Sequence, residues 1–339
     1  MKAIYLVRSG PARSAFEIRE APQPCPKESE VLIKAEAFGL NFAEVMARLK
    51  LYPDAPPLPC VLGYEVVGRV EAMGANVRSL RNGMRVVALP RFGGYAEYVV
   101  SDFRRVMAIP ESMNAGVAVA LAVQYSTAWF AAEELVQLRE NDHVLINAAA
   151  GGVGSALVQI AKRKKCIVYG ACGSDEKLEF LKTLHVDFPI NYRRQNVCTE
   201  IRKLRGKLGL DVVFDSLGGS SFKQGRGLLG PGGRIVTYGV AELVRSQKPF
   251  APLNLLWNYG FLHPLALLQQ SQSVIGLSLL RAVESKPEII QRCLQSVIDL
   301  AAKGELQPHV GGTFGASDIA DAHKLLESRK SIGKIVVKW

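Results

Sequence analysis

The chain has 339 residues, of which 48% are hydrophobic and 22% charged, a composition typical of a folded globular protein with roughly two domains. The formal net charge is +11, but the basic residues are spread along the chain. Their densest run, Lys162–Lys165, closes a predicted helix, where cations are favoured. No nucleic-acid motif accompanies this charge, so we expect a solvated surface and no specific nucleic-acid partner.

The cysteine pattern and the first residues bear on the compartment. The six cysteines are scattered, and no two have C-x-x-C spacing, which indicates reduced thiols and not a disulfide framework. Residues 1–20 carry four basic side chains and no long apolar core, so they do not resemble a signal peptide. We therefore expect a cytoplasmic protein.

Residues 1–122 alternate short apolar strands with proline-rich turns, the pattern of an all-β, barrel-like domain. A short helix is predicted at Asn41–Leu49, and a long helix from Val117 to Glu134 leads into the next part of the chain. The predicted strands are Lys2–Val7, Val31–Phe38, Glu65–Met73, Arg85–Leu89 and Glu97–Val100.

Residues 143–155 combine a strand, a glycine-rich turn and a helix. Val144–Ile146 is the predicted strand and Val153–Arg163 the predicted helix, and this order is the context of a dinucleotide-binding loop. Gly151 would let the backbone approach a pyrophosphate, and the helix N-terminus would supply N–H groups and positive potential. Ala149 stands where the pattern has its first glycine, so an ordinary strand–helix turn is the alternative for this segment alone.

Strands continue to alternate with helical stretches, which predicts a parallel, doubly wound sheet with its ligand at the carboxyl ends of the strands. The further predicted strands are Cys166–Cys172, Phe188–Tyr192, Leu210–Leu217, Arg234–Val240 after the turn Gly230–Gly233, Val274–Leu279, Val310–Phe314 and Ile332–Val337. The further predicted helices are Asp175–Leu184, Pro287–Lys303 and Ala316–Ser328.

The most apolar stretch, residues 253–268, is too short to span a bilayer and is broken by polar residues and Pro264. It predicts a buried or subunit-facing pair of helices, with membrane contact at most peripheral.

The residues after the second predicted strand bear on the choice of cofactor. NAD-binding folds usually place an acidic residue there, on the ribose hydroxyl, whereas this strand ends in Gly173 and Ser174. Lys177 lies one helical turn on, and Tyr192 with two arginines follows the third strand, a set that suits a 2′-phosphate and favours NADPH over NADH. Asp175 falls at nearly the position of the acid, and we interpret it as a first-turn residue interacting with the helix dipole. Lys177 and Tyr192 as plain surface residues are the alternative.

Several segments, in order from end to end, resemble the medium-chain dehydrogenase/reductase superfamily, and within it the zinc-free NADPH:quinone oxidoreductase branch. The resemblance implies an α/β protein with a GroES-like β-barrel domain (residues 1–124 and 283–339) and a Rossmann, doubly wound parallel-sheet domain (residues 125–282). Residues 270–280 and the apolar stretch before them look most like the VAT-1-like subgroup. The segments are Gly39–Glu44, Leu62–Gly68, Gly83–Val86, Gly93–Tyr98, Ala148–Gly154, Ile190–Tyr192, Phe214–Gly218 and Ser331–Lys334.

The chain departs from the zinc-dependent members of the superfamily. Their catalytic zinc needs a Cys, a His and a further Cys, and the matching positions here hold Asn41, Tyr64 and Val123. The cysteine-rich lobe of a structural zinc is also missing, because Leu89–Tyr95 passes directly into Ala96. We therefore expect no metal, and acceptors that take hydride without a Lewis acid.

The resemblance also implies roles for individual residues. Asn41, Phe42 and Thr127 would contact the cofactor, and Asn41 and Thr127 would also border the acceptor. Tyr52 and Tyr64 would face the acceptor and donate to its carbonyl oxygen, with plain packing aromatics as the alternative. The acceptor would lie in the cleft between the two domains, over the nicotinamide. The remaining implied cofactor contacts are Gly151, Gly152 and Val153 on the pyrophosphate, Gly173, Ser174, Lys177 and Tyr192 around the 2′-phosphate, Tyr238, Gly239, Val240 and Leu277 on the nicotinamide side, and Lys334 nearby.

These observations predict an NADPH-dependent enzyme that reduces quinones or other α,β-unsaturated carbonyls by hydride transfer, without zinc, and works as a homodimer. One alternative is an alkenal or enoyl reductase. The alternative from another class is a VAT-1-like, nucleotide-binding, membrane-associated regulatory protein with little turnover.

Overall fold

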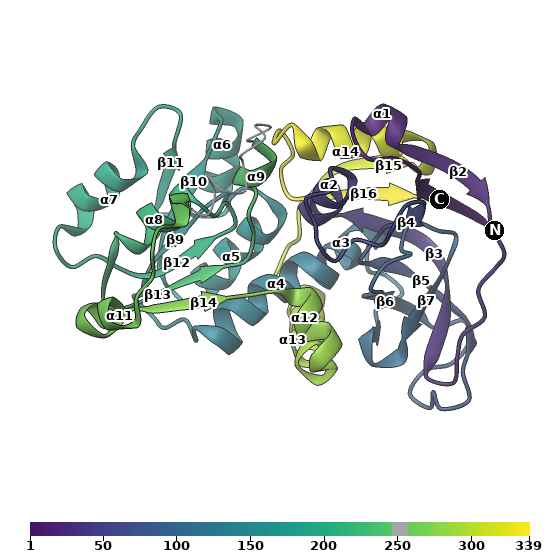
Figure 1. Cartoon of the computed structure of the whole chain (residues 1–339). Helices are drawn as coiled ribbons and strands as arrows, with labels where there is room; N and C mark the ends of the chain where they lie inside the picture. Colours follow the sequence, from purple (N-terminus) through teal and green to yellow (C-terminus); the bar gives the residue numbers. More distant parts are fainter. Residues whose placement is uncertain (246–256) are drawn as a thin grey trace. The chain divides into compact units, whose positions relative to one another are not determined.

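The computed structural model describes residues 1–245 and 257–339, and the chain divides into two compact units (Figure 1). The first unit comprises Met1–Ser126 and Leu279–Trp339, and the second comprises Thr127–Ser278. Each unit has sheets and a buried apolar core of its own, so each is described by itself.

The first unit is built mainly from antiparallel strands, as the short strands and proline-rich turns of the sequence predict. Its larger sheet has the order β15 (Val310–Gly315), β16 (Lys334–Lys338), β3 (Glu30–Leu40), β5 (Val66–Met73), β6 (Arg85–Ala88) and β8 (Val106–Ala108), and β7 (Tyr98–Asp102) pairs with β3. Its smaller sheet has the order β2 (Phe16–Glu20), β1 (Lys2–Leu6) and β4 (Cys60–Val61).

Helices α1 (Ala12–Ala15), α2 (Phe42–Arg48), α12 (Leu279–Ser285), α13 (Pro287–Ala302) and α14 (Ile319–Glu327) belong to the same unit. The predicted helices at Asn41–Leu49 and Pro287–Lys303 are confirmed within one residue at each end. The apolar face read from the sequence of α13 is buried, with Ile290, Leu294 and Val297 each at most 1% exposed. Strands β2 and β4 were not predicted, because the exposed, charged residues of β2 and the two-residue length of β4 give no apolar pattern.

A continuous helix, Ala115–Leu135, follows β8 and confirms the predicted helix at Val117–Glu134. It consists of α3 (Ala115–Ala120), α4 (Ser126–Trp129) and π-helical turns at Leu121–Tyr125 and Phe130–Leu135. Within the described residues it is the one helix long and apolar enough to cross a membrane, and 72% of its most apolar window is buried inside the protein. Length and composition are therefore weak evidence for a span here.

The second unit contains a six-stranded sheet in which every pairing is parallel, so the predicted doubly wound α/β fold is confirmed. The strand order reverses between β9 and β12, so right-handed crossovers place the connecting helices on opposite faces. The strands in spatial order are β11 (Phe188–Asn191), β10 (Ile167–Cys172), β9 (His143–Ile146), β12 (Leu210–Asp215), β13 (Leu229–Thr237) and β14 (Ser273–Gly276). The helices are α5 (Gly152–Arg163), α6 (Asp175–Thr183), α7 (Val197–Arg205), α8 (Ser220–Arg226), α9 (Glu242–Arg245) and α11 (Pro264–Gln270).

One sequence prediction for this unit is wrong, and one of the two alternatives given for the apolar stretch is excluded. Strand β13 starts at Leu229 and runs through Gly230–Gly233, which the sequence predicts as a turn, and a register shift against β12 accommodates these residues. The apolar stretch is not buried in the chain, because Phe261 is 95% exposed and Leu268 75% exposed. Residues 253–256 lie outside the described part, and the subunit-facing alternative stays a prediction.

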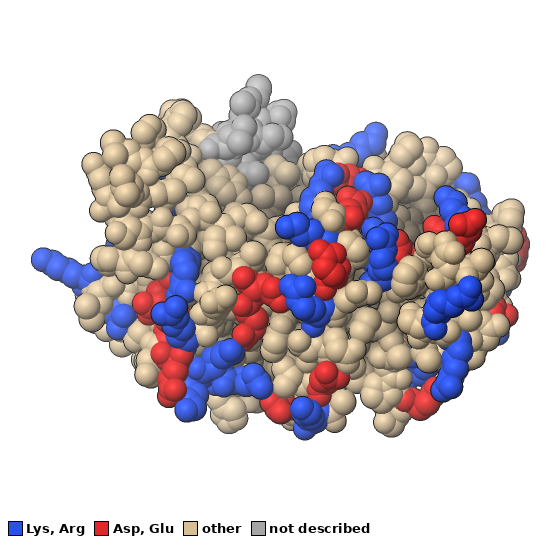
Figure 2. Space-filling model, turned by 90° about the horizontal axis from the view of Figure 1, so that it is seen from below, with Lys and Arg blue, Asp and Glu red and all other residues tan. Residues whose placement is uncertain are grey.

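The charge distribution agrees with the expectation of a solvated surface. On the face shown in Figure 2, basic side chains lie among acidic ones and do not gather into one basic patch. Basic side chains also form ion pairs with acidic ones at the surface, such as those of Arg69 with Glu111 and of Arg104 with Asp102.

Candidate functional site

The candidate site in the first unit begins where β3 passes into α2. Strand β3 ends at Leu40, and the next residue, Asn41, is the N-cap of α2. Glu44 lies three positions on, and its Oε2 accepts a hydrogen bond from the Asn41 N–H at 2.5 Å, as in a capping box. Both residues are buried, with Asn41 at 8% and Glu44 at 0% exposure. Local helix capping therefore fixes two polar side chains inside the unit.

Lys334, at the start of β16, sends a fully buried ammonium group to the same place. Its Nζ donates to Leu40 O at 3.2 Å, to Asn41 Oδ1 at 2.9 Å and to Glu65 Oε1. An ammonium group has three hydrogens, and all of them are used by this unit. The prediction that Lys334 lies near a cofactor stays untested, and its described hydrogen bonds are internal.

Glu65 and Lys334 together determine the orientation of the Asn41 amide. Asn41 Nδ2 donates to Glu65 Oε1 at 2.7 Å, while Oδ1 accepts from Lys334. A carboxylate only accepts and an ammonium only donates, so exchanging Oδ1 and Nδ2 would break both hydrogen bonds. Glu65 is fixed in turn, because its Oε2 accepts from the Val123 N–H at 3.0 Å. The second hydrogen of Nδ2 has no partner within the described residues and is available to a ligand.

The close approach of these groups requires a glycine in β3. A Cβ atom built on Gly39 would lie 2.3 Å from Lys334 Cε and 2.4 Å from Glu65 Oε1. Both atoms belong to fully buried side chains, which cannot move away without breaking the ion pair. The ion pair between Lys334 and Glu65 occupies the space that a side chain at position 39 would need, which explains the glycine there.

Glu44 is the second carboxyl of the cluster, and it differs from Glu65 in having no cation on it. Its Oε1 is buried and has no hydrogen-bond partner in the described part of the chain. The pKa of Glu44 is raised to about 8, chiefly by burial and also by the Glu65 carboxylate, while the Lys334 ammonium and backbone hydrogen bonds act in the opposite direction. Glu44 is therefore predominantly protonated and neutral at pH 7.

Tyr52 and Tyr64, the predicted donors to an acceptor, lie together in this unit. Their rings meet edge to face with centroids 6.2 Å apart, and Tyr64 also packs on Phe92 at 5.1 Å. Burial raises the pKa of both phenols, so both keep their protons at neutral pH. The Tyr64 hydroxyl is buried beside the Tyr52 phenol, and the interaction of the two hydroxyls lowers the pKa of Tyr52 and raises that of Tyr64. The two phenols therefore act as one polar pair on an otherwise aromatic wall.

The second candidate site is the glycine-rich turn after β9. Helix α5 begins at Gly152 with Gly151 as its N-cap, and no side chain caps its first N–H groups. Those N–H groups have no acceptor inside the helix and suit an anion. A Cβ on Gly154 would lie 2.3 Å from Ala148 O, so this glycine permits the tight turn. The left-handed residue of the turn is Ala148, with φ of 52°, and Ala149 therefore needs no glycine.

The other predicted cofactor residues of this unit follow the carboxyl ends of neighbouring strands. Residues 173–177 follow β10, Tyr192 follows β11, residues 238–240 follow β13, and Leu277 follows β14. The carboxyl ends of parallel strands lie at one edge of the sheet, so the fold brings these residues to the edge that carries the glycine-rich turn. Thr127 is buried in this unit too. That it contacts the same cofactor as Asn41 and Phe42 stays a prediction.

Gly173 and Tyr192, both predicted to surround a 2′-phosphate, are in contact. A Cβ on Gly173 would lie 2.3 Å from Tyr192 Oη, so a side chain at this position would displace the phenol from its present place. Ser174 is the N-cap of α6 and its Oγ accepts from the Lys177 N–H at 3.3 Å. The structure thus gathers Gly173, Ser174, Lys177 and Tyr192 at the start of α6.

Asp175, next to this group, is held by residues that sequence reasoning did not connect with it. Its Oδ1 accepts from Asn191 Nδ2 at 3.0 Å, and its Oδ2 forms an ion pair with Arg194. Asp175 is the first residue of α6, as predicted, but its carboxylate bonds to the turn after β11 as well as lying at the helix N-terminus.

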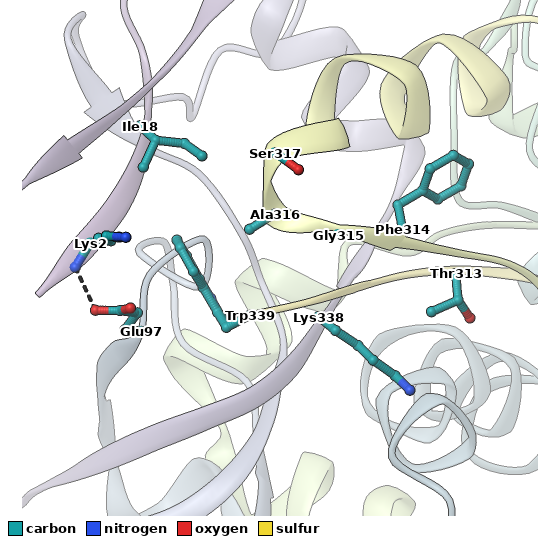
Figure 3. Close-up of a pocket in the computed structure, with 10 residues that line it drawn as sticks. All are labelled: Lys2, Ile18, Glu97, Thr313, Phe314, Gly315, Ala316, Ser317, Lys338 and Trp339. Carbon is teal, nitrogen blue, oxygen red and sulfur yellow. Dashed lines mark hydrogen bonds between the residues drawn. The ribbon is translucent and has the colours of Figure 1, made fainter.

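One pocket of the first unit lies away from these residues. It has a volume of about 620 Å³ and is lined by residues of β1, β2, β15 and β16, with Trp339 and Lys338 at its wall (Figure 3). Glu97 accepts the Lys2 N–H at 2.6 Å beside it. Asn41, Tyr52 and Tyr64 do not line it, so we do not assign it to the predicted reaction.

Comparisons with known proteins agree with this arrangement. The family "Alcohol dehydrogenase GroES-like domain" matches residues 27–111, and the family "Zinc-binding dehydrogenase" matches residues 184–337. The human synaptic vesicle membrane protein VAT-1 homolog is 35% identical over 95% of this chain and 82% of its own length. The bovine quinone oxidoreductase-like protein 2 is 32% identical over 93% of this chain and 86% of its own.

The chain belongs to the medium-chain dehydrogenase/reductase superfamily. It lies in the branch of VAT-1 and the quinone oxidoreductases. The crystal structure of the Thermus thermophilus quinone oxidoreductase, which was also solved with NADPH, is 30% identical, covers both chains completely and superposes with a TM-score of 0.81. Membership makes this chain an oxidoreductase of the superfamily, and the resemblance read from the sequence is confirmed.

Sequence reasoning missed several residues of the two sites. Glu44 and Glu65 lie in segments that carry the resemblance, yet nothing in their local pattern shows that they share one buried cluster with Lys334. Glu65 and Lys334 are separated by most of the chain and meet only because β16 pairs with β3. The capping-box spacing of Asn41 and Glu44 was the one local signal that could have identified Glu44.

Proposed function

We propose that this oxidoreductase uses NADPH to reduce quinones or other α,β-unsaturated carbonyls by hydride transfer, without zinc. The observation that carries the proposal is the group around Asn41, where an amide bound to the Lys334 ammonium, the Tyr64 phenol and the apolar Val123 stand at the positions of the metal ligands. The uncapped glycine turn at α5 and the cluster of Gly173, Ser174, Lys177 and Tyr192 support NADPH as the cofactor. Bound NADPH would supply the hydride, and the acceptor would be a small molecule.

The donor atoms at the positions of the family's catalytic zinc do not fit the metal. Asn41 Oδ1 already accepts from the Lys334 ammonium, which would repel a second cation. Tyr64 keeps its proton because burial raises the pKa of its phenol, and Val123 has no ligating side chain. Zinc sites in proteins are built from thiolates, imidazoles and carboxylates. Of the two carboxyl groups in this cluster, Glu65 is bound to Lys334, and Glu44 keeps its proton because burial raises its pKa.

We therefore expect metal analysis of the purified, dialysed protein to find no stoichiometric zinc. NADPH oxidation should continue after treatment with a chelator, because no proposed step uses a metal. A chelator that abolishes the activity, followed by recovery on addition of zinc, would contradict this proposal.

The proposed roles of the residues follow from their hydrogen-bonding capacity. Asn41 offers one amide hydrogen from a fixed orientation, and it would position the acceptor or the nicotinamide ribose. Tyr52 or Tyr64 would donate to the acceptor oxygen as negative charge develops there. Because burial raises both phenol pKa values, the tyrosine is a donor throughout the neutral range. The proton that completes the reduction comes from this phenol or from water.

Replacement of the tyrosines by phenylalanine tests this assignment. We expect Tyr64→Phe or Tyr52→Phe to lower turnover with the preferred acceptor while the Kd for NADPH stays unchanged. Loss of one donor to an oxyanion costs about 2–4 kcal/mol of barrier, and less where water replaces it. The measurement is NADPH oxidation over a panel of quinones, enones and alkenals. Full turnover of both single variants and the double variant with every acceptor would show that the rings only pack.

The same panel separates the alternatives. Higher kcat/KM with alkenals or enoyl substrates than with quinones would indicate an alkenal or enoyl reductase. The exposed apolar side chains of Trp257, Phe261 and Leu268 favour a second candidate function, a VAT-1-like protein that contacts membranes at their surface. Co-sedimentation with liposomes, together with no NADPH oxidation over the whole panel, would support that candidate.

We also propose that the protein forms a homodimer and is located in the cytoplasm. Strand β14 is an edge of the parallel sheet, and the exposed apolar residues around α11 precede it directly in the chain. An unpaired edge strand beside apolar side chains suits a second copy of the chain.

A further inference from the structure

Asp175 stands close to the position where nucleotide-binding folds select between the two nicotinamide cofactors. It follows Ser174, the N-cap of α6, directly after the carboxyl end of β10. A free carboxylate near this position accepts hydrogen bonds from the ribose hydroxyls of NADH. The same carboxylate repels the 2′-phosphate of NADPH, because like charges at short distance disfavour each other.

The carboxylate of Asp175 is not free in this chain. Oδ1 accepts from Asn191 Nδ2 at 3.0 Å, and Oδ2 is paired with Arg194 Nη2. Asn191 is only 4% exposed, and its own Oδ1 accepts the Arg193 N–H at 3.1 Å, which sets the orientation of its amide. Both oxygens of Asp175 are therefore occupied, one by the last residue of β11 and one by Arg194 in the turn that follows.

The turn places Arg194 for this pairing through its backbone. The Arg194 N–H donates to Asn191 O at 2.9 Å, and Asn191 pairs with Cys172 across β10 and β11. The guanidinium thus reaches Asp175 from a segment that is tied to the strand beside it. The side chains of Asp175 and Arg194 are 54% and 70% exposed, so added salt screens the pair.

We propose that Arg194 determines cofactor specificity by pairing with Asp175. The guanidinium cancels the negative charge next to Gly173, Ser174 and Lys177 and keeps the carboxylate from the ribose. A chain that carries an acid close to the NADH-selective position thereby selects NADPH. This inference rests on the NADPH preference proposed above and adds that Arg194 maintains this preference by neutralising Asp175.

Binding of both nucleotides to the cofactor-free protein tests the proposal without any acceptor. The Kd values for NADPH and NADH are measured by fluorescence titration at low ionic strength for the wild type and three variants. In Arg194→Gln we expect the ratio of the NADPH Kd to the NADH Kd to rise about two- to fivefold, because the carboxylate becomes free. In the double variant Asp175→Asn with Arg194→Gln, the preference for NADPH should return, because no carboxylate remains.

Arg193→Gln is the matched control, since it removes an equal charge from the adjacent residue without breaking the pair with Asp175. Its effect on the ratio should be clearly smaller than that of Arg194→Gln. A double variant that binds NADPH as weakly as Arg194→Gln would show that Arg194 contacts the phosphate itself, which overturns the proposal. An unchanged ratio in Arg194→Gln overturns it as well. Equal affinity of the wild type for both nucleotides would instead overturn the proposed NADPH preference, and this inference with it.

Discussion

Replacing Lys334 by methionine is expected to destabilise the first unit by about 3–5 kcal/mol, the typical cost of removing one partner of a buried ion pair. The Glu65 carboxylate and the Lys334 ammonium are both 0% exposed. Methionine fills a similar volume but leaves the Glu65 charge without its cation and Asn41 Oδ1 without its donor. Urea unfolding followed by tryptophan fluorescence, to which Trp339 contributes from this unit and Trp129 and Trp257 from the other, measures the loss.

Two further variants make this result specific. Lys338→Met replaces an exposed lysine of the same strand and should change the unfolding free energy by less than about 0.5 kcal/mol. The double variant Lys334→Met with Glu65→Gln should recover most of the loss, because neutral groups then replace both charges. A Lys334→Met variant no less stable than Lys338→Met would contradict the assignment of this ion pair.

The sequence predicted the sheet of the second unit well, because each strand there is a short apolar run closed by a turn. Buried parallel strands read as continuous hydrophobic segments, and Val212–Phe214 in β12 is such a run. The pattern failed at β13, where Gly230–Gly233 looks like a turn but extends the strand. Glycine and proline permit a turn without requiring one, and here the four residues bulge from the strand between the paired positions Leu210–Leu229 and Val212–Arg234.

The candidate cofactor residues could be placed from the sequence because they follow strands whose carboxyl ends share one edge of a parallel sheet. The ion pairs at both sites could not be placed. Arg194 was read as part of a basic set near the phosphate, and only the register of β10 against β11 shows that it meets Asp175. Lys334 and Glu65 come from strands far apart in the sequence, and no local pattern indicates which acid a buried lysine will meet.

The apolar stretch shows a different limit. Its composition predicts a buried or subunit-facing pair of helices, and the exposures of Trp257 (79%) and Phe261 (95%) exclude only burial within the described chain. Hydrophobicity indicates that a segment needs a partner, but it does not say whether the partner is the same chain, a second copy or a membrane. The sequence therefore shows that this surface is apolar, but it does not identify the partner that covers it.

Replacing Glu44 by glutamine is expected to remove a fall in stability with rising pH. The pKa of Glu44 is raised from an ordinary value of 4.5 to about 8 in the folded protein, chiefly by burial. Below pH 4.5 the carboxyl is protonated in both the folded and the unfolded chain. Between pH 4.5 and pH 8 only the unfolded chain releases the proton, so this group lowers the free energy of unfolding by about 1.4 kcal/mol per pH unit. Above pH 8 both states are ionised and the slope from Glu44 ends.

Glutamine keeps an acceptor for the Asn41 N–H and cannot ionise, so the variant should lack this slope. Relative to the wild type, it should gain several kcal/mol between pH 4.5 and pH 8, as a group with a raised folded pKa requires. The measurement is urea unfolding at a series of pH values, again followed by tryptophan fluorescence. Glu71→Gln, an exposed position on β5, is the control and should leave the slope as in the wild type. Equal slopes for the wild type and Glu44→Gln would show that the carboxyl of Glu44 is already ionised in the folded chain at neutral pH, with the Lys334 ammonium compensating both Glu44 and Glu65.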